Sequence, residues 1–257
     1  MPSRTMTKRE LREQRRAERL AAEAAETARS TRHRRLVRLL AAVGVAALAV
    51  VSAAVLSSAG GKPAAPATPQ PAVTSVLAGI PEHGGVLGSP NAPVTLTEYV
   101  DLQCPVCAEA ARDTLPRLIR TQVRTGKAKL DARTLHFIGP DSQRAALVAA
   151  GAEQQGKLWP FLLAFYGAQG QENSGYVTDG FLRDVAQAAG VDADKALAYA
   201  DTAAAQQRVN QADVDAQRLG VNATPTFTIA KGDGAARVLQ KHDIGTLDRA
   251  IAQEAKA

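Results

Sequence analysis

A Cys-x-x-Cys motif constrains this chain more than any other feature. It contains the only two cysteines among the 257 residues, in the order Cys104-Pro105-Val106-Cys107. The motif directly follows the run Val94–Val100, whose alternating residues predict a strand, and it precedes a predicted helix. A helix N-terminus offers free N–H groups and partial positive charge, which stabilise the thiolate that attacks a disulfide. The position of the pair therefore indicates redox chemistry.

Other uses of a cysteine pair need residues that this chain does not place nearby. A structural zinc site takes about four ligands, and the histidines are scattered singly at His33, His83, His136 and His242. Haem attachment needs a histidine directly after the second cysteine, where Ala108 stands. An inert disulfide would close a very short loop and constrain the unfolded chain little. We expect no metal and no cofactor, and we expect His136 to be a core or edge residue.

The net charge of +6 does not indicate a nucleic-acid partner once it is located along the chain. Residues 1–38 carry 12 Lys and Arg against 5 Asp and Glu, a charge of +7, so the remaining 19 basic and 20 acidic residues sum to −1. The basic character belongs to the tail, and the globular part is nearly neutral. We therefore expect no binding of DNA or RNA.

The N-terminal third predicts a membrane anchor. Residues 1–35 form a charged tail, and 36–59 contain the uncharged, alanine-rich run Leu39–Leu56, which approaches the roughly 20 residues that a membrane-spanning helix needs. Because the positive charge precedes this run, we expect a cytoplasmic N-terminus and an exported remainder, as in a single-pass protein of the cell membrane. A cleaved signal peptide is the alternative, since Ser57-Ser58-Ala59 offers small residues at a cleavage position.

Residues 60–85 are rich in proline and alanine and predict an extended linker. The globular domain is then expected over 86–257. Its pattern predicts strands over Val94–Val100 and Leu130–Ile138 and, between them, a helix from Pro105 to about Arg124 with a kink at Pro116.

The second half of the domain predicts a helical block followed by two strands and a helix. Glycines end four predicted helices: Ser142–Gln155, Pro160–Tyr166, Thr178–Ala189 and Ala193–Leu219. The last elements are two strands joined by a turn at 231–234, and a helix: Thr226–Ala230, Ala235–Lys241 and Thr246–Ala255. The resulting order is that of an α/β thioredoxin-like fold with a helical insertion at about 141–220.

Four local sequences carry a resemblance to the DsbA-like family of extracytoplasmic thiol–disulfide oxidoreductases. They are Glu98, six residues before the first cysteine, then Asp101-Leu102-Gln103-Cys104-Pro105-Val106-Cys107, then Trp159-Pro160-Phe161, and finally the loop Gly220-Val221-Asn222-Ala223-Thr224-Pro225-Thr226-Phe227. The resemblance covers about Val86 to Ala255. It implies that Cys104 is the exposed nucleophile and that Cys107 is the resolving thiol.

The same resemblance assigns roles to residues around the motif. Pro225 is similar to the cis-proline that faces the dithiol, and it would expose the main chain of Thr224 to a substrate strand, beside Pro105 and Val106. Glu98 matches a buried acid that accepts the proton of the inner cysteine; an outward surface position is the alternative. Val106 departs from the strongly oxidising enterobacterial relative, which has a histidine there, so the Cys104 pKa is expected to be less depressed than in that relative.

These observations predict an exported, membrane-anchored enzyme that oxidises the thiols of substrate proteins through the Cys104–Cys107 disulfide. The resemblance implies reoxidation by a quinone-linked membrane partner, of a DsbB-like or vitamin-K-epoxide-reductase-like kind. We expect a monomer, because no dimerisation domain is visible. Two alternatives stay open: a reductase or disulfide isomerase of exported proteins, and a redox-inert binding module that kept the fold.

Overall fold

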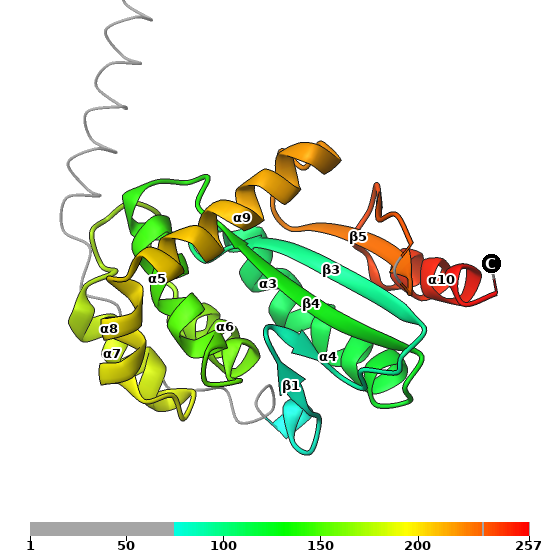
Figure 1. Ribbon diagram of the computed structural model, residues 1–257, viewed down its shortest axis with the longest axis horizontal. Coiled ribbons are helices and arrows are strands. Elements are labelled where there is room, and N and C mark those ends of the chain that lie inside the picture. The colour runs from blue at the N-terminus through cyan, green and yellow to red at the C-terminus, as the bar shows by residue number, and fades with distance from the viewer. Residues whose placement is uncertain (1–74, 233, 257) are drawn as a thin grey trace, which may run out of the picture. The chain divides into compact units, whose positions relative to one another are not determined.

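The computed structural model describes residues 75–232 and 234–256 (Figure 1). The tail predicted over 1–35 and the membrane helix predicted over 36–59 lie outside the described residues. Within the described ranges, no helix has the length and apolar character needed to cross a membrane. Residues Lys62–Ala257 form one compact unit.

A six-stranded sheet organises the domain in the order β1-β2-β4-β3-β5-β6. The central strands β3 (Val94–Asp101) and β4 (Ala128–Leu135) are parallel, and β5 (Thr226–Lys231) runs antiparallel to β3. The edge strand β6 (Arg237–Val238) pairs with β5 across the predicted turn. This arrangement confirms the thioredoxin-like topology predicted from the element order.

The helix predicted over 105–124 is divided in the structure. It consists of α3 (Pro105–Asp113), α4 (Leu115–Leu118) and a π-helical turn, η2 (Ile119–Val123). The break falls beside Pro116, which has no N–H to continue the helical hydrogen bonding. The predicted kink is therefore confirmed.

A short hairpin before the expected start of the domain was not predicted. The turn η1 (Ser75–Leu77) and the strands β1 (Glu82–His83) and β2 (Val86–Leu87) precede β3, and β2 pairs with β4. Val76 and Leu77 are buried in the main core. Residues 75–85 therefore belong to the folded domain and not to the linker predicted over 60–85, because their apolar side chains are covered despite the proline-rich composition around them.

The insertion consists of five helices between β4 and β5: α5 (Pro140–Glu153), α6 (Leu158–Gly167), α7 (Asp179–Ala188), α8 (Ala193–Ala200) and α9 (Ala203–Leu219). The prediction of a single helix over 193–219 is wrong. The segment forms two helices, α8 and α9, because the Thr202 hydroxyl accepts a hydrogen bond from the Ala205 N–H and so begins a new helix.

The bounds of three further elements differ from the prediction. Strand β4 ends at Leu135 and not at Ile138, whose N–H donates to the Asp101 carboxylate. Strand β6 has only two residues. The last helix, α10 (Ile244–Glu254), begins two residues earlier than expected because the Asp243 carboxylate caps it.

The two faces of the sheet are covered by different helices. Val94, Leu96 and Val100 belong to the main core together with α3, α4 and α10. Tyr99 and Leu135 point to the other face, where they join residues of α9 in a smaller cluster. Because side chains alternate along a strand, Glu98 lies on the same face as Leu96 and Val100, beneath α3.

Candidate active site

The Cys-x-x-Cys motif stands at the N-terminus of α3, directly after the end of β3. Cys104 is the N-cap of this helix, and its Sγ accepts a hydrogen bond from the Cys107 N–H at 3.4 Å. Both cysteines are free thiols. The structure therefore confirms the prediction that the motif lies at a strand-to-helix junction.

The loop before β5 lies against Cys104, although it is far away in the sequence. The Cys104 thiol donates a hydrogen bond to the Thr224 carbonyl at 3.3 Å, across 120 residues of chain. The Thr224–Pro225 peptide bond is cis, as the resemblance implies. The pairing of Tyr99 with Thr226 fixes this proximity, because it places the start of β5 beside the end of β3.

The environment of Cys104 favours its thiolate. Its pKa is lowered to about 6, chiefly by a hydrogen bond from the Cys107 side chain, with further contributions from the Thr224 side chain and from backbone N–H groups of Val106 and Cys107. Cys104 is only 6% exposed, so the exposed nucleophile that the resemblance implies is covered in this structure, and its burial acts in the opposite direction on the pKa. A thiol with this pKa is mostly ionised at neutral pH, and the thiolate is the reactive form.

Cys107 has the opposite environment. It is 1% exposed, and burial raises the pKa of its thiol far above the usual range, with further increases from Cys104 and from the charge of Glu98. Glu98 is 2% exposed, and burial raises its pKa to about 8. At neutral pH a buried neutral acid therefore lies near a buried neutral thiol.

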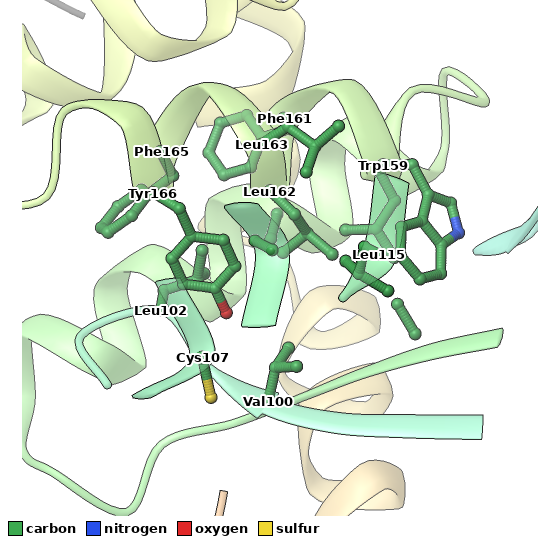
Figure 2. Packing of buried hydrophobic residues seen from close by; sticks show 14 of the residues in the cluster. Val100, Leu102, Cys107, Leu115, Trp159, Phe161, Leu162, Leu163, Phe165 and Tyr166 are labelled. Atoms are coloured by element: carbon green, nitrogen blue, oxygen red, sulfur yellow. The ribbon is translucent and has the colours of Figure 1, made fainter. Parts of the chain in front are cut away.

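The insertion places Tyr166 of α6 near Cys107, among the buried residues on the inner side of the dithiol (Figure 2). The Tyr166 hydroxyl donates to the Asp101 carbonyl at 3.3 Å. Burial is the largest cause that raises the pKa of the Tyr166 hydroxyl. The charges of Cys107 and Glu98 raise this pKa further. The aromatic residues of α6, Trp159, Phe161, Phe165 and Tyr166, are all buried, and the Tyr166 hydroxyl also contacts the catalytic turn.

A buried carboxylate holds the turn before Cys104. Asp101 is fully buried, and its carboxylate accepts hydrogen bonds from the Gln103 N–H at 2.9 Å, the Ser142 hydroxyl at 2.6 Å and the Ile138 N–H at 3.0 Å. These donors come from three segments of the chain. The carboxylate therefore joins the catalytic turn to the exit of β4 and the start of α5.

Two amide side chains connect the same turn to the insertion. Gln169 Nε2 donates to the Leu102 carbonyl at 2.8 Å and to the Cys104 carbonyl at 3.2 Å. The buried Gln103 side chain accepts a hydrogen bond from the Asn173 N–H at 2.7 Å. Sequence reasoning missed Gln169 and Asn173. The only local signal was Asp101 and Gln103, two polar residues at the end of an otherwise buried strand.

The outer edge of the site is exposed and partly apolar. Val106 is 44% exposed beside Cys104, and Phe137, just after β4 at the same end of the sheet, is 49% exposed. The four residues expected to contact substrate, Pro105, Val106, Thr224 and Pro225, thus lie at one edge of the dithiol. His136 is not part of this group, because its Nε2 lies 2.9 Å from the Asp213 carboxylate of α9.

Comparison with known proteins agrees with this fold and site. A family model described as "Thioredoxin" matches residues 82–251. The chain therefore belongs to the thioredoxin family.

Similarity to individual proteins defines the class more closely. The chain is 27% identical over 176 residues to "Probable disulfide bond formation protein D" of Bacillus anthracis, covering 66% of this chain and 77% of that protein. The crystal structure of oxidised BdbD from Bacillus subtilis matches with a TM-score of 0.61 at 23% identity, over 69% of this chain and 99% of that one. DsbA2 of Pseudomonas aeruginosa matches with a TM-score of 0.55 at 26% identity, over 69% and 97%. Together with the dithiol, these matches identify a DsbA-like thiol–disulfide oxidoreductase.

Proposed function

We propose that this enzyme oxidises the thiols of exported proteins outside the cytoplasm. The observation that carries the proposal is the opposite shift of the two cysteine pKa values, with that of Cys104 lowered to about 6 and that of Cys107 raised. A stabilised Cys104 thiolate stabilises the reduced enzyme, and a stabilised reduced form makes the disulfide form a stronger oxidant.

In the proposed cycle, a substrate thiolate attacks Cys104 Sγ of the Cys104–Cys107 disulfide. The S–S bond breaks, a mixed disulfide forms, and Cys107 leaves as a thiolate that takes a proton. A second substrate thiolate then attacks the substrate sulfur and releases the Cys104 thiolate. The substrate loses two electrons and gains a disulfide, and the enzyme is reduced to the dithiol.

Glu98 is proposed as the proton donor to Cys107. Its pKa of about 8 keeps it protonated at neutral pH, and it lies close enough for its charge to raise the Cys107 pKa. In the reduced enzyme Glu98 regains a proton from solvent, as its pKa of about 8 requires. When the dithiol is reoxidised, the steps run in reverse: Glu98 releases its proton to solvent and then takes the proton of Cys107, so that neither buried group is left charged in the oxidised or the reduced enzyme. This is general acid–base catalysis by an acid whose pKa burial has brought near the working pH.

Substrate is proposed to lie along the edge formed by Pro105, Val106, Thr224 and Pro225. Thr224 is partly exposed beside Cys104, and an extended substrate segment can hydrogen-bond to main chain at such a place. Apolar substrate side chains would contact Val106.

The location and partners of the enzyme are proposed from the sequence. Residues 36–59 are proposed as a single membrane anchor with the domain outside the cytoplasm, where disulfides persist. Reoxidation is assigned to a quinone-linked membrane protein, of a DsbB-like or vitamin-K-epoxide-reductase-like kind. The enzyme is proposed to act as a monomer.

The redox potential of the purified protein tests the direction of the reaction. Equilibration in glutathione buffers, followed by thiol alkylation, should give a potential nearer the ~−120 mV of DsbA than the ~−270 mV of thioredoxin. A value near thioredoxin would overturn the oxidase proposal in favour of a reductase. That second candidate is favoured by one observation: a Cys104 pKa of about 6 lies closer to the ~7 of thioredoxin than to the ~3.5 of DsbA.

A further inference from the structure

The end of the domain opposite the dithiol carries a concentration of positive charge. Within residues 112–129, Asp113 is the only acidic residue, and six residues are basic: Arg112, Arg117, Arg120, Arg124, Lys127 and Lys129. Arg117, Arg120 and Arg124 are exposed and recur at the three- and four-residue spacing of one helical face along α4 and η2. Lys127 and Lys129 follow at the start of β4.

We call five of these side chains the basic end: Arg117, Arg120, Arg124, Lys127 and Lys129. Their ionic surroundings differ from those of the insertion. Among the described residues, no ion pair reaches any member of the basic end. In the insertion, by contrast, Arg144 pairs with Asp179 and Asp201, Arg183 with Asp194, and Lys195 with Asp192. The positive charge of the insertion is locally neutralised, and that of the basic end is not.

The strand register places the basic end far from the active site. Ala128 pairs with Val94 at the start of β3, whereas Cys104 follows Asp101 at the other end of that strand. At about 3.3 Å per residue, the eight-residue strand separates the two ends by about 23 Å. In Figure 1, α4 accordingly lies away from α5 and from the end of α9 that precedes β5.

The polypeptide also enters the domain at the basic end. The Arg124 guanidinium donates to the Val76 carbonyl at 2.9 Å and to the Ala78 carbonyl at 2.8 Å. These are among the first described residues of the chain. The 74 residues before them contain the proposed membrane anchor, so the described part of the chain begins beside the basic end, on the side of the sequence that carries this anchor.

We propose that the basic end binds the phosphate headgroups of an anionic membrane surface and holds the dithiol on the side that faces away. The inference rests on the proposed membrane attachment but not on the direction of the redox reaction. Arginine forks suit phosphate oxygens, and each basic residue near an anionic leaflet strengthens binding roughly fivefold. In this orientation Cys104 remains accessible to soluble substrates.

The test compares two charge-matched variants of residues 62–257. The Bacillus subtilis structure matches over 99% of its length and covers 69% of this chain. A domain of this fold therefore folds without a counterpart of the N-terminal segment. One variant carries Arg117→Gln, Arg120→Gln and Lys127→Gln, and the control carries Arg144→Gln, Arg183→Gln and Lys195→Gln. Both lose three positive charges, and Arg124 is left unchanged because it holds the main chain of residues 76–78. Thermal melts establish that both variants are folded.

Binding is measured by sedimentation with phosphatidylcholine vesicles that contain or lack phosphatidylglycerol. We expect the parent domain and the control to bind only the anionic vesicles, and the basic-end variant to bind about a hundredfold more weakly. The proposal is overturned by equal losses in both variants, by no binding of the parent domain, or by equally strong binding of soluble polyglutamate, which would indicate an acidic protein partner.

A second measurement tests the orientation. The alkylation rate of Cys104 in the reduced domain should be the same with and without anionic vesicles, because the proposed contact lies about 23 Å away. Protection of Cys104 by vesicles would place the active site at the membrane and overturn the inference. Neither measurement depends on the redox potential, so this inference and the oxidase proposal can fail separately.

Discussion

The two sulfur atoms of the active site lie one helical turn apart in very different surroundings. Cys104 stands at the N-terminus of α3, where hydrogen bonds from Cys107, Thr224 and main-chain N–H groups lower its pKa to about 6. Cys107 lies inside the domain near Glu98 and Tyr166, where burial raises its pKa. The same helix thus provides one reactive thiolate and one protected thiol.

The difference has a structural origin in two parts of the fold. The outer environment comes from the thioredoxin elements, namely the start of α3 and the loop before β5. The surroundings of Cys107 are completed by the insertion, through Tyr166, and the Gln169 amide of the insertion binds the catalytic turn. An insertion that appears in the sequence as a separate helical block therefore contributes directly to the electrostatics of the dithiol.

Removing either sulfur should give the largest effect. In the reduced protein, Cys104→Ser should lower the rate of reaction with an added model disulfide by more than about 1,000-fold, because the remaining thiol, that of Cys107, is buried and protonated. Cys107→Ala should instead keep a reactive Cys104, accumulate mixed disulfides with substrate, and raise the Cys104 pKa, since it removes the strongest stabilising hydrogen bond.

Bromobimane alkylation across pH measures these effects. The reduced parent protein should show a midpoint near pH 6, Cys107→Ala a higher midpoint, and Cys107→Ser an intermediate one, because the serine hydroxyl still donates. A midpoint unchanged in Cys107→Ala would contradict the cause assigned to the low pKa of Cys104.

Glu98→Gln should have the next largest effect and should separate catalysis from stability. Loss of the proton donor to Cys107 should slow thiol oxidation about 100-fold at pH 7. The folded-state pKa of about 8 is raised, so the penalty for burying Glu98 is absent at pH 4 and grows until about pH 8. The variant should therefore match the parent in melting temperature at pH 4 and exceed it by roughly 5–10 °C at pH 8.

Stopped-flow kinetics and thermal melts at the two pH values measure both effects. Loss of activity without a pH-dependent gain in stability would mean that Glu98 acts while ionised and would argue against its role as an acid.

The parts of this site that the sequence could predict are those that a short motif carries. Cys104 and Cys107 follow a strand directly, Pro225 lies in a recognisable loop, and the two-residue period of β3 is consistent with a buried Glu98. Thr202 is a residue type that often caps helices, but the alanine-rich pattern over 193–219 favoured one continuous helix, so the helix start at Thr202 was not predicted.

The parts that could not be predicted depend on contacts between distant segments. Gln169 and Asn173 reach the catalytic turn across 65 to 70 residues, and nothing in the local pattern of a polar loop specifies the partner of an amide. The turn and hairpin over 75–87 were missed for a similar reason, because burial of Val76 and Leu77 depends on the packing of η1 against η2 and not on the proline-rich segment itself.

Gln169→Leu tests the contribution of the insertion to the outer thiol and should have a moderate effect. Without the amide, the Leu102 carbonyl loses this donor, the Cys104 carbonyl keeps only the helical Ala108 N–H, and the turn that holds Cys104 is less well fixed. We expect the rate of thiol oxidation to fall about tenfold, with a higher Cys104 pKa in the alkylation profile.

Gln155→Leu is the matched control. Gln155 also donates to two carbonyls, those of Gly151 and Asp192, but both lie within the insertion. Each variant should lose roughly 1–2 kcal/mol of stability, and only Gln169→Leu should change the pKa. An equal change of the Cys104 pKa in both would assign the effect to general loosening of the insertion.

Val106→His should give the smallest effect and tests the outer thiol alone. Val106 is 44% exposed next to Cys104 and cannot donate a hydrogen bond, whereas an imidazole can donate to the thiolate and, when protonated, attract it. The alkylation midpoint should fall below pH 6 by up to about one unit, and the redox potential should become more oxidising.

Val214→His, on α9 and 51% exposed, is the control for a surface histidine and should leave both values unchanged. Because position 106 is exposed and position 214 lies on α9, neither substitution should disturb the packing around Cys107, and the melting temperature at pH 4 should stay as it is. A lower melting temperature in Val106→His alone would mean that the change at the outer thiol also disturbs the buried surroundings of Cys107.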